Sequence, residues 1–125
     1  MPFVDTQPGG LRVTVASLSR GGHVVTATGD LDAGAMPTLR RRLGPLADEH
    51  GAHVILDLSG TTFVDPSVLG VLAATAARLG EQEGELIVVG NDLRLRRLLD
   101  GDEQRIRIEP SLAEVVEKVV GDTTL

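Results

Sequence analysis

The segment from His53 to Gly80 constrains the fold most strongly. It opens with the apolar run Val54-Ile-Leu-Asp-Leu58, passes through a turn-rich loop to Asp65-Pro-Ser67, and ends in a long apolar stretch with helical spacing. A buried strand that leads directly into a helix is typical of α/β proteins with a mostly parallel sheet. Ligand and switch sites in such sheets lie where strands end and helices begin. We therefore expect the functional site at this junction, where unpaired N–H groups could receive an anion such as a phosphate.

The rest of the chain continues the alternation of strands and helices. Residues 11–18 and 23–28 alternate apolar and polar side chains on either side of Gly21-Gly22, which predicts an antiparallel hairpin. Residues 32–50 have helical spacing, but two prolines predict a late start or a kink. An apolar strand at 85–90, a short helix after Asn91 or Asp92, a short strand at 105–108 and a capped helix from Ser111 complete the pattern.

The predicted order is β-β-α-β-α-β-α-β-α, which indicates an α/β fold. We expect a single domain over residues 1–125, with a mixed, mostly parallel sheet of about five strands covered by about four helices. Residues 1–10 and 121–125 show no such pattern and are expected to be frayed.

The composition restricts the kind of partner. The chain has no cysteine, a formal net charge of -6 and only two aromatic residues, which argues against thiol chemistry and against a nucleic-acid surface. No signal peptide and no membrane-spanning run is recognisable, so we predict a cytoplasmic protein without membrane insertion. Its partners are expected to be proteins, with a homo-oligomer as a further possibility.

Known catalytic patterns are missing from the sequence. It contains no phosphate-binding glycine loop and no nucleophile elbow, and the spacing of His23, His50 and His53 does not suit a metal. We expect these histidines on the surface or at strand edges. The sequence thus predicts no enzyme activity, no cofactor and no metal site, although weak nucleotide binding stays open.

Four carboxylates lie near the predicted carboxyl edge of the sheet. Considered alone, Asp32 would cap a helix, Asp65 would form a turn and Asp30 would be a solvated turn residue. Asp57 falls inside the apolar run and would need a hydrogen-bond donor if buried. Spacing and composition favour these local roles.

Ser67 has two interpretations, a helix cap and a switch. Serine before an apolar helix is usually a cap that contributes about 1 kcal/mol. Pro110-Ser111 has the same local form and is interpreted as a cap only. Physical reasoning alone therefore favours a cap over a switch at Ser67.

Several motifs in order resemble the STAS domain family, in particular the bacterial anti-sigma factor antagonists. They are Gly29-Asp-Leu-Asp32, Leu56-Asp-Leu-Ser59, Phe63-Val-Asp65, Ser67 and Leu69-Gly-Val-Leu72. The resemblance implies binding to an anti-sigma factor that is also a serine kinase, release of a sigma factor, phosphorylation at Ser67 and resetting by a PP2C-type phosphatase. By the same resemblance, the expected partner-binding residues are Asp30, Asp32, Asp65, Pro66, Ser67, Val68 and Leu69.

Two positions depart from the pattern of that family. Pro66 replaces a serine or threonine, and Val68 replaces a small residue, so we expect the branched Val68 side chain to hinder a kinase at Ser67. A STAS domain that serves only as an interaction module, in lipid transport or stress signalling, is the alternative. A phospho-aspartate receiver is a second alternative, but the predicted first strand holds no acidic pair, and Lys118, the only lysine, lies in the last helix.

Overall fold

The protein is described by a computed structural model that covers residues 3–6, 10–90, 93–100 and 106–121. The strands are β1 (Phe3–Thr6), β2 (Arg12–Ser17), β3 (Gly22–Leu31), β4 (His53–Val64), β5 (Glu85–Val89) and β6 (Arg107–Glu109). The α-helices are α1 (Met36–Ala47), α2 (Val68–Glu81), α3 (Leu93–Asp100) and α4 (Leu112–Val120). Short 3-10 helices, η1 (Ser19–Gly21) and η2 (Ala33–Ala35), precede β3 and α1.

One mixed sheet holds all six strands in chain order. β1 with β2 and β2 with β3 are antiparallel, whereas the pairs from β3 through β6 are parallel. The predicted hairpin and the α/β class with a mixed sheet are therefore confirmed. The expectation of a frayed amino terminus is wrong for Phe3–Thr6, which pairs with β2 and adds a sixth strand. Its sequence, Phe-Val-Asp-Thr, does not alternate apolar and polar residues, so periodicity does not reveal this strand.

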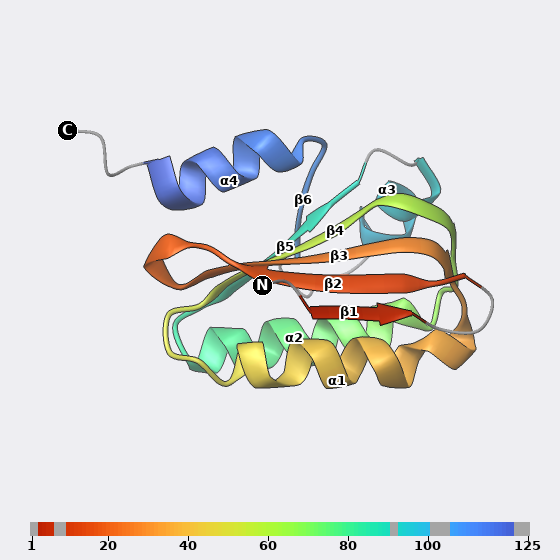
Figure 1. Ribbon diagram of the computed structural model, residues 1–125, viewed down its shortest axis with the longest axis horizontal. Helices are drawn as coiled ribbons and strands as arrows, with labels where there is room; N and C mark the ends of the chain where they lie inside the picture. Colours follow the sequence, from red (N-terminus) through yellow and green to blue (C-terminus); the bar gives the residue numbers. More distant parts are fainter. Residues whose placement is uncertain (1–2, 7–9, 91–92, 101–105, 122–125) are drawn as a thin grey trace.

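The helices cover both faces of the sheet. Figure 1 shows α1 and α2 side by side under one face and α4 over the other. The larger core lies between the sheet and helices α1 and α2. The smaller core, on the side of α4, consists of Ile55, Ile87, Val89 and Val115. Because successive side chains of a strand point to opposite faces, β4 must be apolar on both. This explains the continuous run from Val54 to Leu58, all of which is buried.

The helix ends follow the sequence prediction in most details. A late start of the first helix is confirmed, because η2 precedes α1, and α1 runs on through Pro45 to Ala47. The capped last helix is also confirmed as α4. The predicted cap at Asn91 or Asp92 and the first residue of the predicted 105–108 strand lie outside the described residues. Within the described part of the chain, no helix is long and apolar enough to span a membrane.

Candidate functional site

Ser67 lies where β4 passes into α2, at the edge of the sheet formed by the carboxyl ends of the parallel strands. In Figure 1 this edge is on the right, where β3 and β4 lead into α1 and α2. The connection is short and is fixed to β3, since the Asp65 N–H donates to the Leu31 carbonyl at 2.8 Å. Ser67 is exposed, directly before the first residue of α2. The strand-to-helix junction thus presents one hydroxyl to solvent.

The Ser67 hydroxyl does not cap α2. Ser67 has helical backbone angles, with φ -60° and ψ -16°, and its side chain makes no capping hydrogen bond. Ser111 instead has extended angles, with φ -126° and ψ 121°, and its hydroxyl accepts from the Glu114 N–H at 3.3 Å. The two Pro-Ser sequences therefore differ in three dimensions. Ser111 is a cap, whereas the expected capping role of the Ser67 side chain is wrong.

Local hydrogen bonds explain why Ser67 is not needed as a cap. The Ser67 N–H donates to Asp65 Oδ1 at 2.8 Å. The next two N–H groups, of Val68 and Leu69, donate to the carbonyls of Asp65 and Pro66 at 3.0 and 3.1 Å. These groups are already paired, so the expectation that they would receive an anion is wrong. A group added to the hydroxyl would instead extend into solvent beside a carboxylate.

That carboxylate belongs to Asp65, which forms the predicted turn. The hydrogen bond from the Ser67 backbone N–H, with a smaller effect of the Ser67 side chain, lowers the pKa of the Asp65 carboxyl. Its negative charge therefore persists at neutral pH. A second negative charge placed on Ser67 would meet this one directly.

The other expected acidic residues lie at the same edge, on the end of β3. Asp30 is exposed and accepts from the Thr62 hydroxyl at 2.5 Å. Asp32 accepts from the Ala35 N–H at 3.1 Å, so its predicted helix-capping role is confirmed for η2. Strand register brings the two ends together, because Asp30 pairs with Phe63 on β4. Residues far apart in the chain thus share one negatively charged edge.

Asp57 belongs to the strand rather than to this edge. It is 6% exposed, and its Oδ1 accepts from the Ser59 N–H at 3.0 Å and from the Ser59 hydroxyl at 2.6 Å. The prediction that a buried Asp57 needs donors is confirmed. These two bonds from Ser59 satisfy the Asp57 carboxylate within the chain, so it needs no group from a partner protein.

The side chains after Ser67 divide between surface and core. Pro66 is exposed and Leu69 is half-buried against the larger core. Val68 is 0% exposed, so its inclusion among partner-binding residues is wrong. Because its side chain points into the core, the expected hindrance of a kinase at Ser67 is wrong as well. Residue 68 is the first helical position, and its direction follows from how α2 packs on the sheet.

Two exposed apolar side chains near this edge were missed by the sequence analysis. Phe63, the penultimate residue of β4, is 44% exposed, and Leu93, which begins α3, is 61% exposed. Large exposed apolar groups are informative when they lie next to other surface features. Phe63 neighbours Asp30 by register and extends the edge with an apolar contact. The sequence offered one signal for Phe63: it is one of only two aromatic residues in the chain, and it directly precedes the Val64-Asp65 pair.

The histidines lie at the opposite edge of the sheet and pair with glutamates. His53 Nδ1 lies 2.7 Å from Glu85, and His50 Nε2 lies 3.3 Å from Glu83. His23 is 8% exposed, which corrects its predicted surface position; its two ring nitrogens contact Ser17 and Glu49. Among the described residues, no group of three or more potential metal ligands exists.

Comparison with known proteins agrees with this fold. The family model of the STAS domain matches residues 15–115, so the chain belongs to the STAS domain family. Within that family, the chain is similar to an anti-sigma-B factor antagonist of Bacillus subtilis, with 36% identity over 76 residues, which cover 61% of this chain and 69% of that protein.

Solved structures show the same similarity. A crystal structure of an anti-sigma factor antagonist from Mycobacterium paratuberculosis superposes with a TM-score of 0.75 and 26% identity, covering 91% of this chain and 97% of that one. The Bacillus cell fate determinant SpoIIAA in its phosphorylated form superposes with a TM-score of 0.71 and 16% identity, covering 86% and 98%. The latter similarity concerns the fold alone.

Proposed function

We propose that this protein is an anti-sigma factor antagonist whose binding to an anti-sigma factor kinase is switched by phosphorylation of Ser67. The observation that carries this proposal is the exposed Ser67 hydroxyl, which has no capping role at the start of α2. A side chain that does not stabilise its own helix is available for another purpose. The relatives named above support the choice of partner. In this proposal the protein acts in the cytoplasm, where ATP is available, as the substrate of an enzyme and not as an enzyme.

The proposed partner surface is the carboxyl edge of the sheet around Ser67. It combines acidic groups, the exposed ring of Phe63 and the first turn of α2. Its members are Asp30, Asp32, Phe63, Asp65, Pro66, Ser67 and Leu69. A mixture of an apolar contact and ordered polar groups is typical of protein interfaces. The acidic residues call for a partner with basic groups facing them.

Phosphate on Ser67 would weaken this interface through charge. It adds about -1.5 to -2 charges at pH 7, next to the ionised Asp65. The site lies on the surface, so the added group can be hydrated without disturbing the core. A partner surface shaped for a neutral hydroxyl would then face a bulky, hydrated anion. A loss of about 3 kcal/mol corresponds to more than a hundredfold in affinity, and the domain itself would stay folded.

Intact-mass spectrometry with candidate anti-sigma factor kinases and ATP tests the proposal. We expect the mass of one phosphate on the wild type and on Ser111→Ala, and none on Ser67→Ala. Ser111 is a matched control because it also follows a proline and precedes a helix. We further expect Ser67→Asp to weaken kinase binding in the absence of ATP, and Phe63→Ala to weaken it without preventing folding.

Other outcomes would point to a different function. Binding of the kinase without any gain in mass would contradict the switch and favour a STAS module that binds constitutively, with no role for Ser67 chemistry. Phosphate on the Ser67→Ala variant would place the site elsewhere. If phosphorylation occurs, a PP2C-type phosphatase is the proposed resetting enzyme, and its addition should restore both the original mass and kinase binding.

A further inference from the structure

Gly70 lies in the first turn of α2, three residues after Ser67. It is exposed, and its φ is not positive, so its backbone conformation also suits residues with side chains. Outside its chain neighbours and its own helix backbone, a Cβ atom built on Gly70 would have no heavy atom of the described residues within 4 Å. Glycine weakens a helix relative to alanine. Neither the backbone nor packing within the described chain therefore requires a glycine at this position.

Gly70 and Ser67 are neighbours on the surface of the helix. Ser67 already has helical backbone angles, with φ -60° and ψ -16°, and residues three apart in a helix have Cβ atoms about 5–6 Å apart. Helical side chains lean toward the amino terminus of the helix and cover the preceding turn. A long side chain at position 70 would therefore extend over the Ser67 hydroxyl. Gly70 leaves that hydroxyl uncovered.

The neighbouring side chains leave one open approach to the Ser67 hydroxyl. Val68 and Val71 point into the core, with 0% and 1% of their surface exposed. On the other side, the Asp65 carboxylate accepts from the Ser67 N–H at 2.8 Å. Its negative charge would repel the γ-phosphate of ATP from that side. The surface over Gly70 has no side chain and hence no charge, so it is the most favourable path for a phosphate donor.

We propose that Gly70 gives an anti-sigma factor kinase access to Ser67 and thereby decides whether this serine can be phosphorylated. This inference rests on the proposed function of Ser67. In the transfer, Ser67 Oγ bonds to the γ-phosphorus of ATP, the bond between this phosphorus and the leaving oxygen of ADP breaks, and the hydroxyl proton passes to a base of the kinase. The reacting atoms must come within about 3–3.5 Å of each other, so the kinase has to place ATP directly over the first turn of α2.

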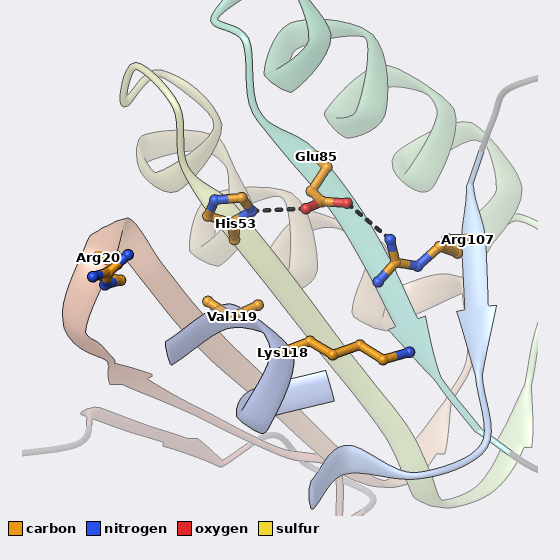
Figure 2. Close-up of a pocket in the computed structure, with 6 residues that line it drawn as sticks. All are labelled: Arg20, His53, Glu85, Arg107, Lys118 and Val119. Atoms are coloured by element: carbon orange, nitrogen blue, oxygen red, sulfur yellow. Dashed lines mark hydrogen bonds and ion pairs between the residues drawn. The ribbon is translucent and has the colours of Figure 1, made fainter. Parts of the chain in front are cut away.

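Gly80 provides a matched control at the other end of α2. It is also exposed, and a Cβ atom built there would meet as little of the described chain as one on Gly70. It follows Ser67 by 13 positions, which places it about 20 Å further along the helix. α2 ends at the edge of the sheet where β5 begins. Figure 2 shows this edge, where Glu85 lies 2.7 Å from His53 and 3.4 Å from Arg107. A side chain at position 80 therefore cannot cover Ser67.

Phosphorylation by an anti-sigma factor kinase that modifies the wild type tests the inference, with kcat/KM and the unfolding temperature measured for each variant. Gly70→Leu is expected to lower kcat/KM about a hundredfold, as for a displacement of about 1 Å at a reacting centre, and Gly70→Ala to lower it less. Gly80→Leu and Gly80→Ala are expected to react like the wild type. Because alanine favours the helix at both positions, Gly70→Ala and Gly80→Ala should each raise the unfolding temperature by about 2–4 °C. Slower phosphorylation of a more stable variant cannot result from misfolding.

A chemical probe tests access to position 67 without any kinase. The chain has no cysteine, so Ser67→Cys introduces a single thiol at the site. Adding Gly70→Leu to this variant should slow the reaction with fluorescein maleimide, a bulky reagent, more than the reaction with iodoacetamide. Adding Gly80→Leu should change neither rate. The comparison of two reagents separates steric cover from a change in the reactivity of the thiol.

Three results would overturn the inference. They are phosphorylation of Gly70→Leu at the wild-type rate, an equal loss of phosphorylation in Gly80→Leu, and labelling of Ser67→Cys that does not respond to Gly70→Leu. If the wild type is phosphorylated, these results leave the proposed function intact. A wild type that no anti-sigma factor kinase phosphorylates would contradict the proposed function itself, and the inference would fall with it.

Discussion

The two Pro-Ser helix starts allow a direct test of the claim that only one serine is a cap. Ser67→Ala removes a hydroxyl that makes no capping bond, whereas Ser111→Ala removes the acceptor of the Glu114 N–H. The alanine side chain suits the helical backbone of residue 67, so no strain is expected there. The two substitutions are chemically identical, and a difference between them must come from the surrounding structure.

The expected difference follows from the cost of a lost cap. Ser111→Ala should lower the free energy of unfolding by about 1 kcal/mol, the typical value for a serine cap. Ser67→Ala should change it by no more than about 0.5 kcal/mol in either direction, as for a surface substitution. With a urea dependence of about 2 kcal/mol per molar, the unfolding midpoint should fall by about 0.5 M for Ser111→Ala and stay nearly constant for Ser67→Ala.

Urea unfolding followed by far-ultraviolet circular dichroism measures both values. The chain has no tryptophan or tyrosine, so fluorescence is unsuitable. A double variant should show the sum of the two effects, because the sites belong to different helices. Equal losses of about 1 kcal/mol for both single variants would refute the argument, since Ser67 would then stabilise its helix like an ordinary cap.

The remaining predictions concern the acidic edge and the end of β3. The pKa of the Asp65 carboxyl, measured by ¹³C NMR titration, should lie below its ordinary value and remain low in Ser67→Ala, because the main cause is the backbone N–H of Ser67. This interaction stabilises the fold at pH values above the pKa that the Asp65 carboxyl has in the unfolded chain, and the stabilisation is lost as the pH falls through the lowered pKa of the folded state. A measured Asp65 pKa at its ordinary value would contradict the hydrogen bond. Gly29→Ala should destabilise the protein by about 2 kcal/mol or more, because φ is 96° and a Cβ atom would lie 2.6 Å from the Gly10 carbonyl oxygen. Thermal unfolding measures this loss of stability. A Gly29→Ala variant as stable as the wild-type protein would exclude the predicted clash.

The sequence predicted the parts of the fold that depend on local patterns. The alternation in residues 11–18 and 23–28, the apolar run in β4 and the capping box of α4 each led to the element that the structure contains. The edge strand β1 was missed, because its existence depends on pairing with β2 and not on a pattern of its own. His23 was misplaced for a related reason. Its ring nitrogens contact Ser17 on β2 and Glu49 in the turn after α1, and no local pattern reveals these contacts.

By itself, the sequence determined the order of strands and helices, the family resemblance and the position of Ser67 at a strand-to-helix junction. It could not distinguish Ser67 from Ser111, because both follow a proline and precede an apolar helix. Only the tertiary structure decided between them. Asp65 and the preceding backbone carbonyls already pair the first N–H groups of α2, which leaves the Ser67 hydroxyl exposed, and packing of α2 on the sheet turns Val68 into the core.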